Sequence, residues 1–165
     1  MKYAARTVAL AFGCSLAAVA LAQATKPGEL VTPPGASPEA FKPLPERQDV
    51  VSWKLLGQVE LVKMKDRYVP QFAAGVSALD KRDVKLQGFM MPLEMGDKQS
   101  HFILSAMPQS CAFCLPGGPE QLVEIKSKTP VKYTFEPIML SGKLAVLKDD
   151  PTGVYYRLTD AVPAK

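Results

Sequence analysis

The chain has 165 residues and a formal net charge of +4, which is enough length for one domain of ordinary size. Because 20 Lys and Arg are nearly balanced by 16 Asp and Glu, the basic composition typical of a nucleic-acid-binding domain is absent, and we expect no nucleic-acid partner. The sequence has one histidine and no Gly-x-Ser-x-Gly motif, so a hydrolase is poorly supported. We expect a protein that is not an enzyme, with thiol redox chemistry as the open exception.

The first 24 residues follow the pattern of a secretory signal peptide. Lys2 and Arg6 precede a short apolar run over residues 7–21, and Ala22-Gln23-Ala24 supplies the small residues that a signal peptidase requires. The run is shorter than the roughly 20 residues of a membrane-spanning helix. We therefore predict cleavage after residue 24, a periplasmic location and no transmembrane segment in the mature chain. An uncleaved anchor helix is the alternative.

Residues 25–47 contain six prolines and no periodic apolar face, which predicts an extended tether. The remaining residues, 48–165, then form a single β domain. Removal of the signal peptide also removes Cys14 and two positive charges, so the mature chain has a net charge of +2. Its two cysteines, Cys111 and Cys114, lie in an oxidising compartment that permits a disulfide.

Short β-rich runs separated by turn signals fill the domain. The runs predicted as strands are 53–62, 84–91, 101–106, 122–126, 131–135, 143–147 and 155–158. Turns are predicted at residues 95–97, 116–119, 141–142 and 149–153, each of which contains glycine. Phe72, Val76 and Leu79 share one helical face, which predicts a short helix at about 71–81.

This pattern predicts an all-β fold, a small OB-like or sandwich-like barrel of five to seven strands. Gly57 and Gly88 lie in the middle of predicted strands, where glycine indicates a bulge or a close approach of two backbones. Such positions suit the strong coiling of a small barrel.

Cys111 and Cys114 form a Cys-x-x-Cys motif that has several interpretations. The first is a structural disulfide, which would close a very short loop and contribute about 2 kcal/mol. The second is thiol–disulfide exchange, but the run Leu115-Pro116-Gly117-Gly118-Pro119 cannot continue the helix that lowers the thiol pKa in thioredoxin-type sites. The third is a metal site, and the fourth is docking of a partner through Phe113 and Leu115.

The metal interpretation involves residues on either side of the motif. Two thiolates select soft ions, Cu(I) or Zn(II), while a structural zinc site would need four ligands. Cys111 and Cys114 are the main candidates, with His101 and Met107 as additional ligands. A single histidine at the start of a strand is more often a surface residue than a ligand.

Methionines also occur at Met90, Met91 and Met95, a group that resembles a copper-binding cluster. In a strand Met90 and Met91 point to opposite faces, so both cannot easily reach one ion. We expect at least one of them to fill the core.

From about Val84 onward the sequence resembles the domain-of-unknown-function family 3299 of small exported bacterial proteins. The resemblance is carried by several spaced segments: Gly88-Phe89-Met90-Met91-Pro92-Leu93, Phe102-Ile103-Leu104, Cys111 followed by Pro116 and Pro119, the predicted strand Val123–Ile125, Ser141-Gly142-Lys143-Leu144 and Tyr156-Arg157-Leu158. The family has no established reaction. Its members are often encoded near components of ABC-type transporters and metal-transport genes, which implies an accessory role in transport.

Together these observations predict an exported periplasmic accessory protein that handles a metal for a transport system, with an ABC-type transporter as the expected partner. A periplasmic binding or scaffold module with a structural Cys111–Cys114 disulfide is the alternative, and a thiol oxidoreductase is the third.

Overall fold

The computed structural model describes residues 44–108 and 117–165, which belong to one compact unit of the chain. Three short helices and seven strands occur in this described part. The helices are α1 (Trp53–Leu56), α2 (Ala74–Ser77) and the 3-10 helix η2 (Pro119–Gln121). The strands are β1 (Val59–Met64), β2 (Arg67–Phe72), β3 (Asp83–Pro92), β4 (Lys98–Ser105), β5 (Leu122–Lys132), β6 (Ile138–Val146) and β7 (Tyr156–Pro163).

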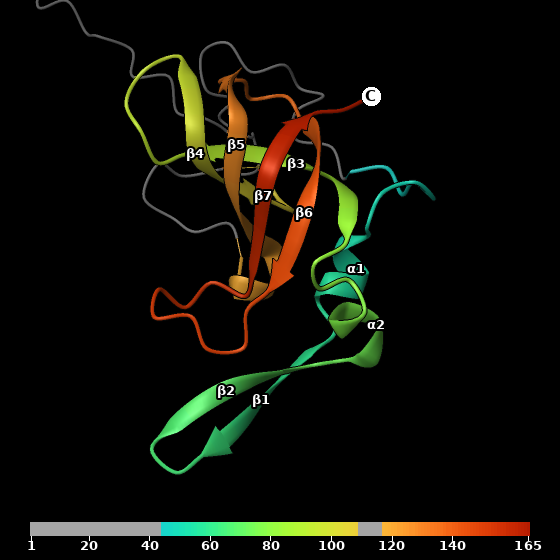
Figure 1. The fold of residues 1–165 in the computed structure, drawn as a ribbon, viewed down its shortest axis with the longest axis vertical. Coiled ribbons are helices and arrows are strands. Elements are labelled where there is room, and N and C mark those ends of the chain that lie inside the picture. The colour runs from blue at the N-terminus through green and yellow to red at the C-terminus, as the bar shows by residue number, and fades with distance from the viewer. Residues whose placement is uncertain (1–43, 109–116) are drawn as a thin grey trace, which may run out of the picture. The chain divides into compact units, whose positions relative to one another are not determined.

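Strands β3 to β7 form a closed barrel in the order β3-β4-β5-β7-β6, and β3 pairs with β6 to close it (Figure 1). Strands β5 and β7 run parallel, whereas the other four pairs are antiparallel. This is the strand order of a five-stranded OB-type barrel. The predicted all-β, OB-like fold is therefore confirmed. Strands β1 and β2 form a separate antiparallel pair.

The barrel interior is filled by the alternate apolar residues of each strand, because successive side chains of a strand point to opposite faces. Phe102 and Leu104 on β4, Val123 and Ile125 on β5, and Leu158 on β7 are completely buried. The residues between them face outward, and that outer face contains the candidate site described below.

Gly88 lies where β3 changes its partner: residues up to Gly88 pair with β6, and residues from Phe89 onward pair with β4. A Cβ atom at position 88 would lie 2.6 Å from the carbonyl oxygen of Ser105 and 2.8 Å from Cγ of Leu104. The close approach expected at this glycine is thus present, and it lets β3 coil between its two neighbours.

Other local predictions are wrong. Residues 53–62 do not form one strand: Ser52 accepts a hydrogen bond from the Leu55 backbone N–H and starts helix α1, Gly57 ends that helix, and the strand begins only at Val59. Gly57 is therefore a helix cap. The turn predicted at residues 141–142 is also wrong. Gly142 lies within β6, where a Cβ would be 2.7 Å from the Thr159 carbonyl oxygen of β7.

Two further differences have simple causes. Residues 67–72 form β2, which the sequence analysis did not predict. Pro70 is tolerated there because β2 pairs only with β1, and an edge strand does not need the backbone N–H that proline lacks. The predicted strand 122–126 continues to Lys132 as the long strand β5, whose pairing shifts between Ile125 and Ser127. Only Val131 and Lys132 of the predicted strand 131–135 lie in a strand, and residues 133–135 are outside it. The predicted helix near 71–81 is present but spans only Ala74–Ser77.

Helix α1 is bound to the barrel by two hydrogen bonds. The Trp53 indole Nε1–H donates to the Gln87 carbonyl at 2.8 Å, and the buried Tyr156 hydroxyl donates to the Leu56 carbonyl at 2.5 Å. Neither α1 nor any other helix within residues 44–108 and 117–165 has the length and apolar character needed to cross a membrane.

Candidate functional site

A row of hydrogen-bonded polar and charged side chains crosses the outer face of the barrel over three neighbouring strands. His101 Nε2 lies 2.8 Å from Glu124 Oε1, and Arg157 Nε donates to Glu124 Oε2 at 2.5 Å. Arg157 Nη2 then donates to Asp150 Oδ2 at 3.1 Å. We call these four residues the polar chain.

Strand order and register bring the polar chain together. Glu124 on β5 lies opposite Arg157 on β7 and opposite Ile103 on β4, so His101 is its diagonal neighbour on the same face. Asp150 comes from the loop between β6 and β7. In OB-type barrels the second and third strands and the loop between the fourth and fifth commonly bind ligands, and these correspond to β4, β5 and the loop that carries Asp150.

Ionised carboxylates are favoured in this arrangement. Burial of Glu124 opposes its ionisation, but hydrogen bonds from Arg157 and His101 outweigh that effect and hold the pKa of Glu124 below its ordinary value. The pKa of Asp150 is also lowered, first by hydrogen bonds from the Thr152 hydroxyl and backbone N–H and then by Arg157. The hydrogen bond to Glu124 raises the pKa of Arg157.

His101 is the accessible end of the polar chain. Its side chain is 43% exposed, whereas the side chain of Glu124 is 11% exposed. An ionised carboxylate can only accept a hydrogen bond, so the hydrogen must be on His101 Nε2. In the neutral form of the ring, the lone pair is then on Nδ1. Metal-binding histidines commonly have this arrangement, in which a carboxylate orients the ring through the other nitrogen.

The remaining sequence-predicted residues have different positions. Met107 lies two residues beyond the end of β4, with its N–H bonded to Ser105 Oγ and its side chain 54% exposed. Ser105 lies four positions beyond His101 on β4, which corresponds to about 13 Å, so the described part of the chain does not bring Met107 to the polar chain. Cys111 and Cys114 lie outside the described residues.

Methionines 90 and 91 alternate as expected for a strand. Met90 is buried in the core, Met91 is only partly buried, and Met95 is fully exposed in the turn between β3 and β4. Within residues 44–108 and 117–165, no group of three or more His, Cys, Asp or Glu side chains is arranged to hold a metal ion. A metal site that uses His101 therefore requires ligands from elsewhere in the chain.

Sequence reasoning missed Glu124, Arg157 and Asp150. The signal that could have identified the first two is a single charge between buried neighbours, Val123-Glu124-Ile125 and Tyr156-Arg157-Leu158. Such a residue must lie on the outer face of its strand. Which two strands are neighbours, however, is not contained in either segment.

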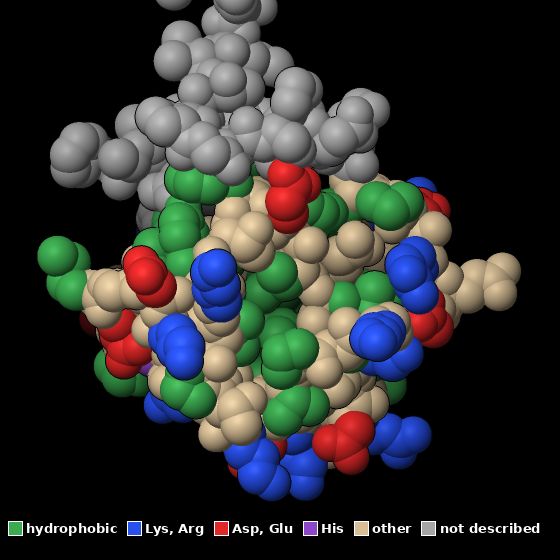
Figure 2. Space-filling model, turned by 90° about the horizontal axis from the view of Figure 1, so that it is seen from above, with side chains coloured by type: hydrophobic (Ala, Val, Ile, Leu, Met, Phe, Trp, Pro, Cys, Tyr) green, Lys and Arg blue, Asp and Glu red, His purple; other side chains and the backbone are tan. Residues whose placement is uncertain are grey.

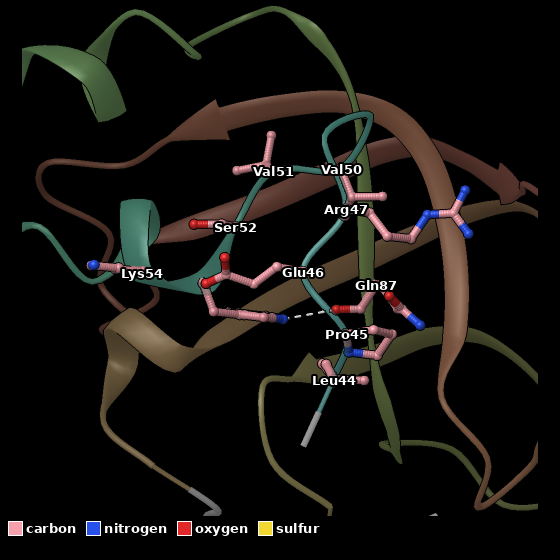
Figure 3. A pocket seen from close by; sticks show the side chains of 10 residues that line it. Leu44, Pro45, Glu46, Arg47, Val50, Val51, Ser52, Lys54 and Gln87 are labelled. Atoms are coloured by element: carbon pink, nitrogen blue, oxygen red, sulfur yellow. Dashed lines mark hydrogen bonds between the residues drawn. The ribbon is translucent and has the colours of Figure 1, made fainter. Parts of the chain in front are cut away.

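A small pocket lies between residues 44–54 and Gln87 on β3, where the Trp53 indole bonds to Gln87 (Figure 3). Its volume of about 130 Å³ is below the range of pockets that hold metabolites. Arg47, one of its charged residues, is already paired with Asp49 at 3.0 Å. We regard this pocket as the junction between α1 and the barrel.

Figure 2 shows the face of the molecule seen from above the view of Figure 1. Hydrophobic side chains gather in its centre, and Lys and Arg side chains surround them with Asp and Glu interspersed. On this face, charged side chains of both signs therefore lie around an apolar centre.

Comparison with known proteins identifies the family. Residues 43–160 match the family model described as "Protein of unknown function (DUF3299)". The chain belongs to the DUF3299 family. The match extends upstream of the motifs noted in the sequence and includes all seven strands as far as Asp160 in β7.

One solved structure of this family is similar to the chain. It is the crystal structure of a DUF3299 family protein from Pseudomonas aeruginosa PAO1, which is 20% identical. The alignment covers 58% of this chain and 68% of that chain, with a TM-score of 0.41. No curated protein matches the chain. DUF3299 has no assigned reaction, so family membership gives no indication of an enzymatic activity.

Proposed function

We propose that this DUF3299 protein is an exported, non-enzymatic accessory component that binds a soft metal ion, Cu(I) or Zn(II), for a transport system. The single observation that supports this proposal best is the His101–Glu124 pair. It orients an exposed imidazole through Nε2, and Nδ1 has no hydrogen-bond partner among residues 44–108 and 117–165, which is how proteins commonly prepare a histidine ligand.

The other ligands of the proposed site are the thiolates of Cys111 and Cys114, to which soft ions bind preferentially. Chain length permits this combination. Cys111 is six residues beyond Ser105, which corresponds to a reach of up to about 20 Å, and His101 lies about 13 Å back along β4. Two thiolates and one imidazole give three ligands, which suits a transferable ion better than a permanent structural zinc.

Export follows from the signal peptide predicted at residues 1–24, and the partner we propose is a periplasmic part of an ABC-type transporter. The supporting argument is the resemblance noted above, since family members are often encoded beside such components. An OB-type barrel is a common framework for binding proteins and requires no catalytic residue.

The test is a metal titration of the reduced mature chain, from Thr25 onward, in competition with a chelator of known affinity. We expect one Cu(I) or Zn(II) per chain, and loss of binding in Cys111→Ser and Cys114→Ser. Glu124→Gln should weaken binding by about 10- to 100-fold, because the carboxylate no longer orients His101. His101→Gln should weaken it at least as much.

The Met107→Leu variant tests the remaining predicted ligand, and Met95→Leu is its matched control because Met95 is fully exposed in another turn. Absence of metal binding by the reduced protein would contradict the proposal. If, in addition, both thiols were oxidised after purification from the periplasm, the scaffold with a structural disulfide would be favoured instead. Catalytic exchange with a small disulfide substrate would favour the oxidoreductase.

A further inference from the structure

The β1–β2 hairpin presents apolar side chains to solvent on both of its faces. Exposed large hydrophobic residues number seven in the described part of the chain, and four of them are in this hairpin: Leu61, Val62, Met64 and Tyr68 are 60%, 38%, 59% and 64% exposed. All residues from 60 to 68 are exposed. Such a concentration marks an interaction site rather than ordinary surface.

The pairing register assigns these side chains to opposite faces. Leu61 lies opposite Pro70 and Lys63 opposite Tyr68, so Leu61 and Tyr68 share one face. Val62 and Met64 alternate with them and lie on the other. A globular partner that packed on one face would leave the other exposed to water, whereas a medium that surrounds the hairpin tip would cover both.

Basic residues accompany the apolar ones. Between positions 63 and 67 the tip has three cations, Lys63, Lys65 and Arg67, and one anion, Asp66. Long basic side chains beside Leu, Met and Tyr are typical of segments that insert their apolar groups at a membrane interface while their charges contact anionic headgroups.

The base of the hairpin is held by the barrel while the tip is exposed. Phe72, at the end of β2, is buried and its ring contacts Tyr155 and Tyr156 with centroids 5.8 and 5.7 Å away. Nearer the tip, Arg67 Nη1 bonds to Asp149 Oδ1 at 2.7 Å. The tip is thus presented on a fixed base, which reduces the entropy lost on binding.

We infer that the β1–β2 hairpin docks the protein on an anionic lipid bilayer, with Leu61, Met64 and Tyr68 entering the interface and Lys63 and Lys65 contacting phosphate headgroups. The inference uses none of the residues of the proposed metal site. Docking of the hairpin brings the barrel to the membrane surface.

The experiment is co-sedimentation of the mature chain with vesicles of phosphatidylcholine alone or mixed in equal parts with phosphatidylglycerol. The mature chain is used because the apolar run at residues 7–21 could itself bind lipid. A metal chelator is present throughout, so that the result does not depend on the proposed metal site.

We expect the protein to bind the phosphatidylglycerol vesicles. This binding should weaken between about 0.1 M and about 1 M salt, because salt shortens the Debye length and screens the attraction between the basic side chains and the headgroups. The double variant Leu61→Ser/Met64→Ser should bind about tenfold more weakly or worse. Leu93→Ser/Met95→Ser is the matched control, since it removes one exposed leucine and one exposed methionine from the β3–β4 turn. The control variant should bind vesicles like the unchanged protein. Both double variants should have the same thermal unfolding midpoint as the unchanged protein.

The variant Lys63→Glu/Lys65→Glu should lose the preference for phosphatidylglycerol. The inference is overturned if the unchanged protein binds neither vesicle, if both serine variants lose binding equally, or if binding is insensitive to lipid charge. It is also overturned if the hairpin variants alter self-association in sedimentation but not vesicle binding, because the hairpin would then be a contact between protein copies.

Discussion

Replacing Arg157 by methionine should destabilise the protein, because it removes the main partner of a nearly buried carboxylate. Glu124 is 8% exposed, and it would keep only the hydrogen bond from His101. Methionine fills much of the volume of the arginine stem, so packing changes little. Hydrogen bonds to a charged group contribute about 1.5–3 kcal/mol, and an unpaired buried charge costs more. We expect a loss of about 2–3 kcal/mol at pH 7.

The loss should depend on pH in a defined direction. The pKa of Glu124 in the folded protein is below its ordinary value, so its ionised form stabilises the fold above the unfolded pKa of about 4.3. That stabilisation disappears as the pH falls through the folded pKa. The carboxyl of Asp150, whose pKa is also lowered, acts in the same sense. The difference between Arg157→Met and the unchanged protein should therefore be constant from pH 6 to 7 and decrease below about pH 4.

Urea unfolding of the mature chain at several pH values measures this effect, and Arg67→Met is the control. Arg67 forms an ion pair of similar length with Asp149, but both side chains are 64% exposed, so its removal should change the stability by less than about 0.5 kcal/mol. Equal losses in the two variants, or a loss for Arg157→Met that is the same at pH 7 and pH 3, would refute the assignment of Glu124 as a buried, ionised partner.

Two further predictions concern the packing of the barrel. Gly88→Ala should lower the free energy of unfolding by about 1–3 kcal/mol, because the new Cβ would lie 2.6 Å from the Ser105 carbonyl oxygen and two barrel strands would have to separate. An unchanged thermal unfolding midpoint would contradict this close approach. Tyr156→Phe should cost about 1–2 kcal/mol, since it leaves the buried Leu56 carbonyl without its 2.5 Å hydrogen bond, while Tyr68→Phe, at an exposed ring, should cost nothing measurable. Denaturant unfolding measures the effect of Tyr156→Phe. Equal stability of Tyr156→Phe and Tyr68→Phe would show that the Tyr156 hydroxyl contributes little.

Local rules of chain geometry were sufficient for the fold class. Short β-rich runs separated by turn signals predicted the strands of the barrel, and glycine in mid-strand predicted the close approach at Gly88. The same local rules failed where two of them competed. Residues 53–56 have strand-like composition, but Ser52 and Gly57 cap them as a helix, and Gly142 resembles a turn although it lies where two barrel strands nearly touch.

The candidate site was predictable only in part. His101 was identified because the chain contains one histidine, and its chemistry was inferred from that residue alone. Its partner Glu124 is 23 positions away, and Arg157 is 33 positions beyond Glu124. No motif links residues at such separations.

The sequence by itself determined that this is an all-β chain, because the period-two pattern of each strand is set by the alternation of side chains along an extended backbone. The segments Val123-Glu124-Ile125 and Tyr156-Arg157-Leu158 also contain the alternation that turns Glu124 and Arg157 outward, although the sequence analysis did not identify these two residues. Only the tertiary structure decided that these two residues meet. Every strand edge offers the same N–H and C=O groups, so a single strand does not specify its partner. The closed order β3-β4-β5-β7-β6 specifies it, and that order places His101, Glu124 and Arg157 side by side on one face of the barrel.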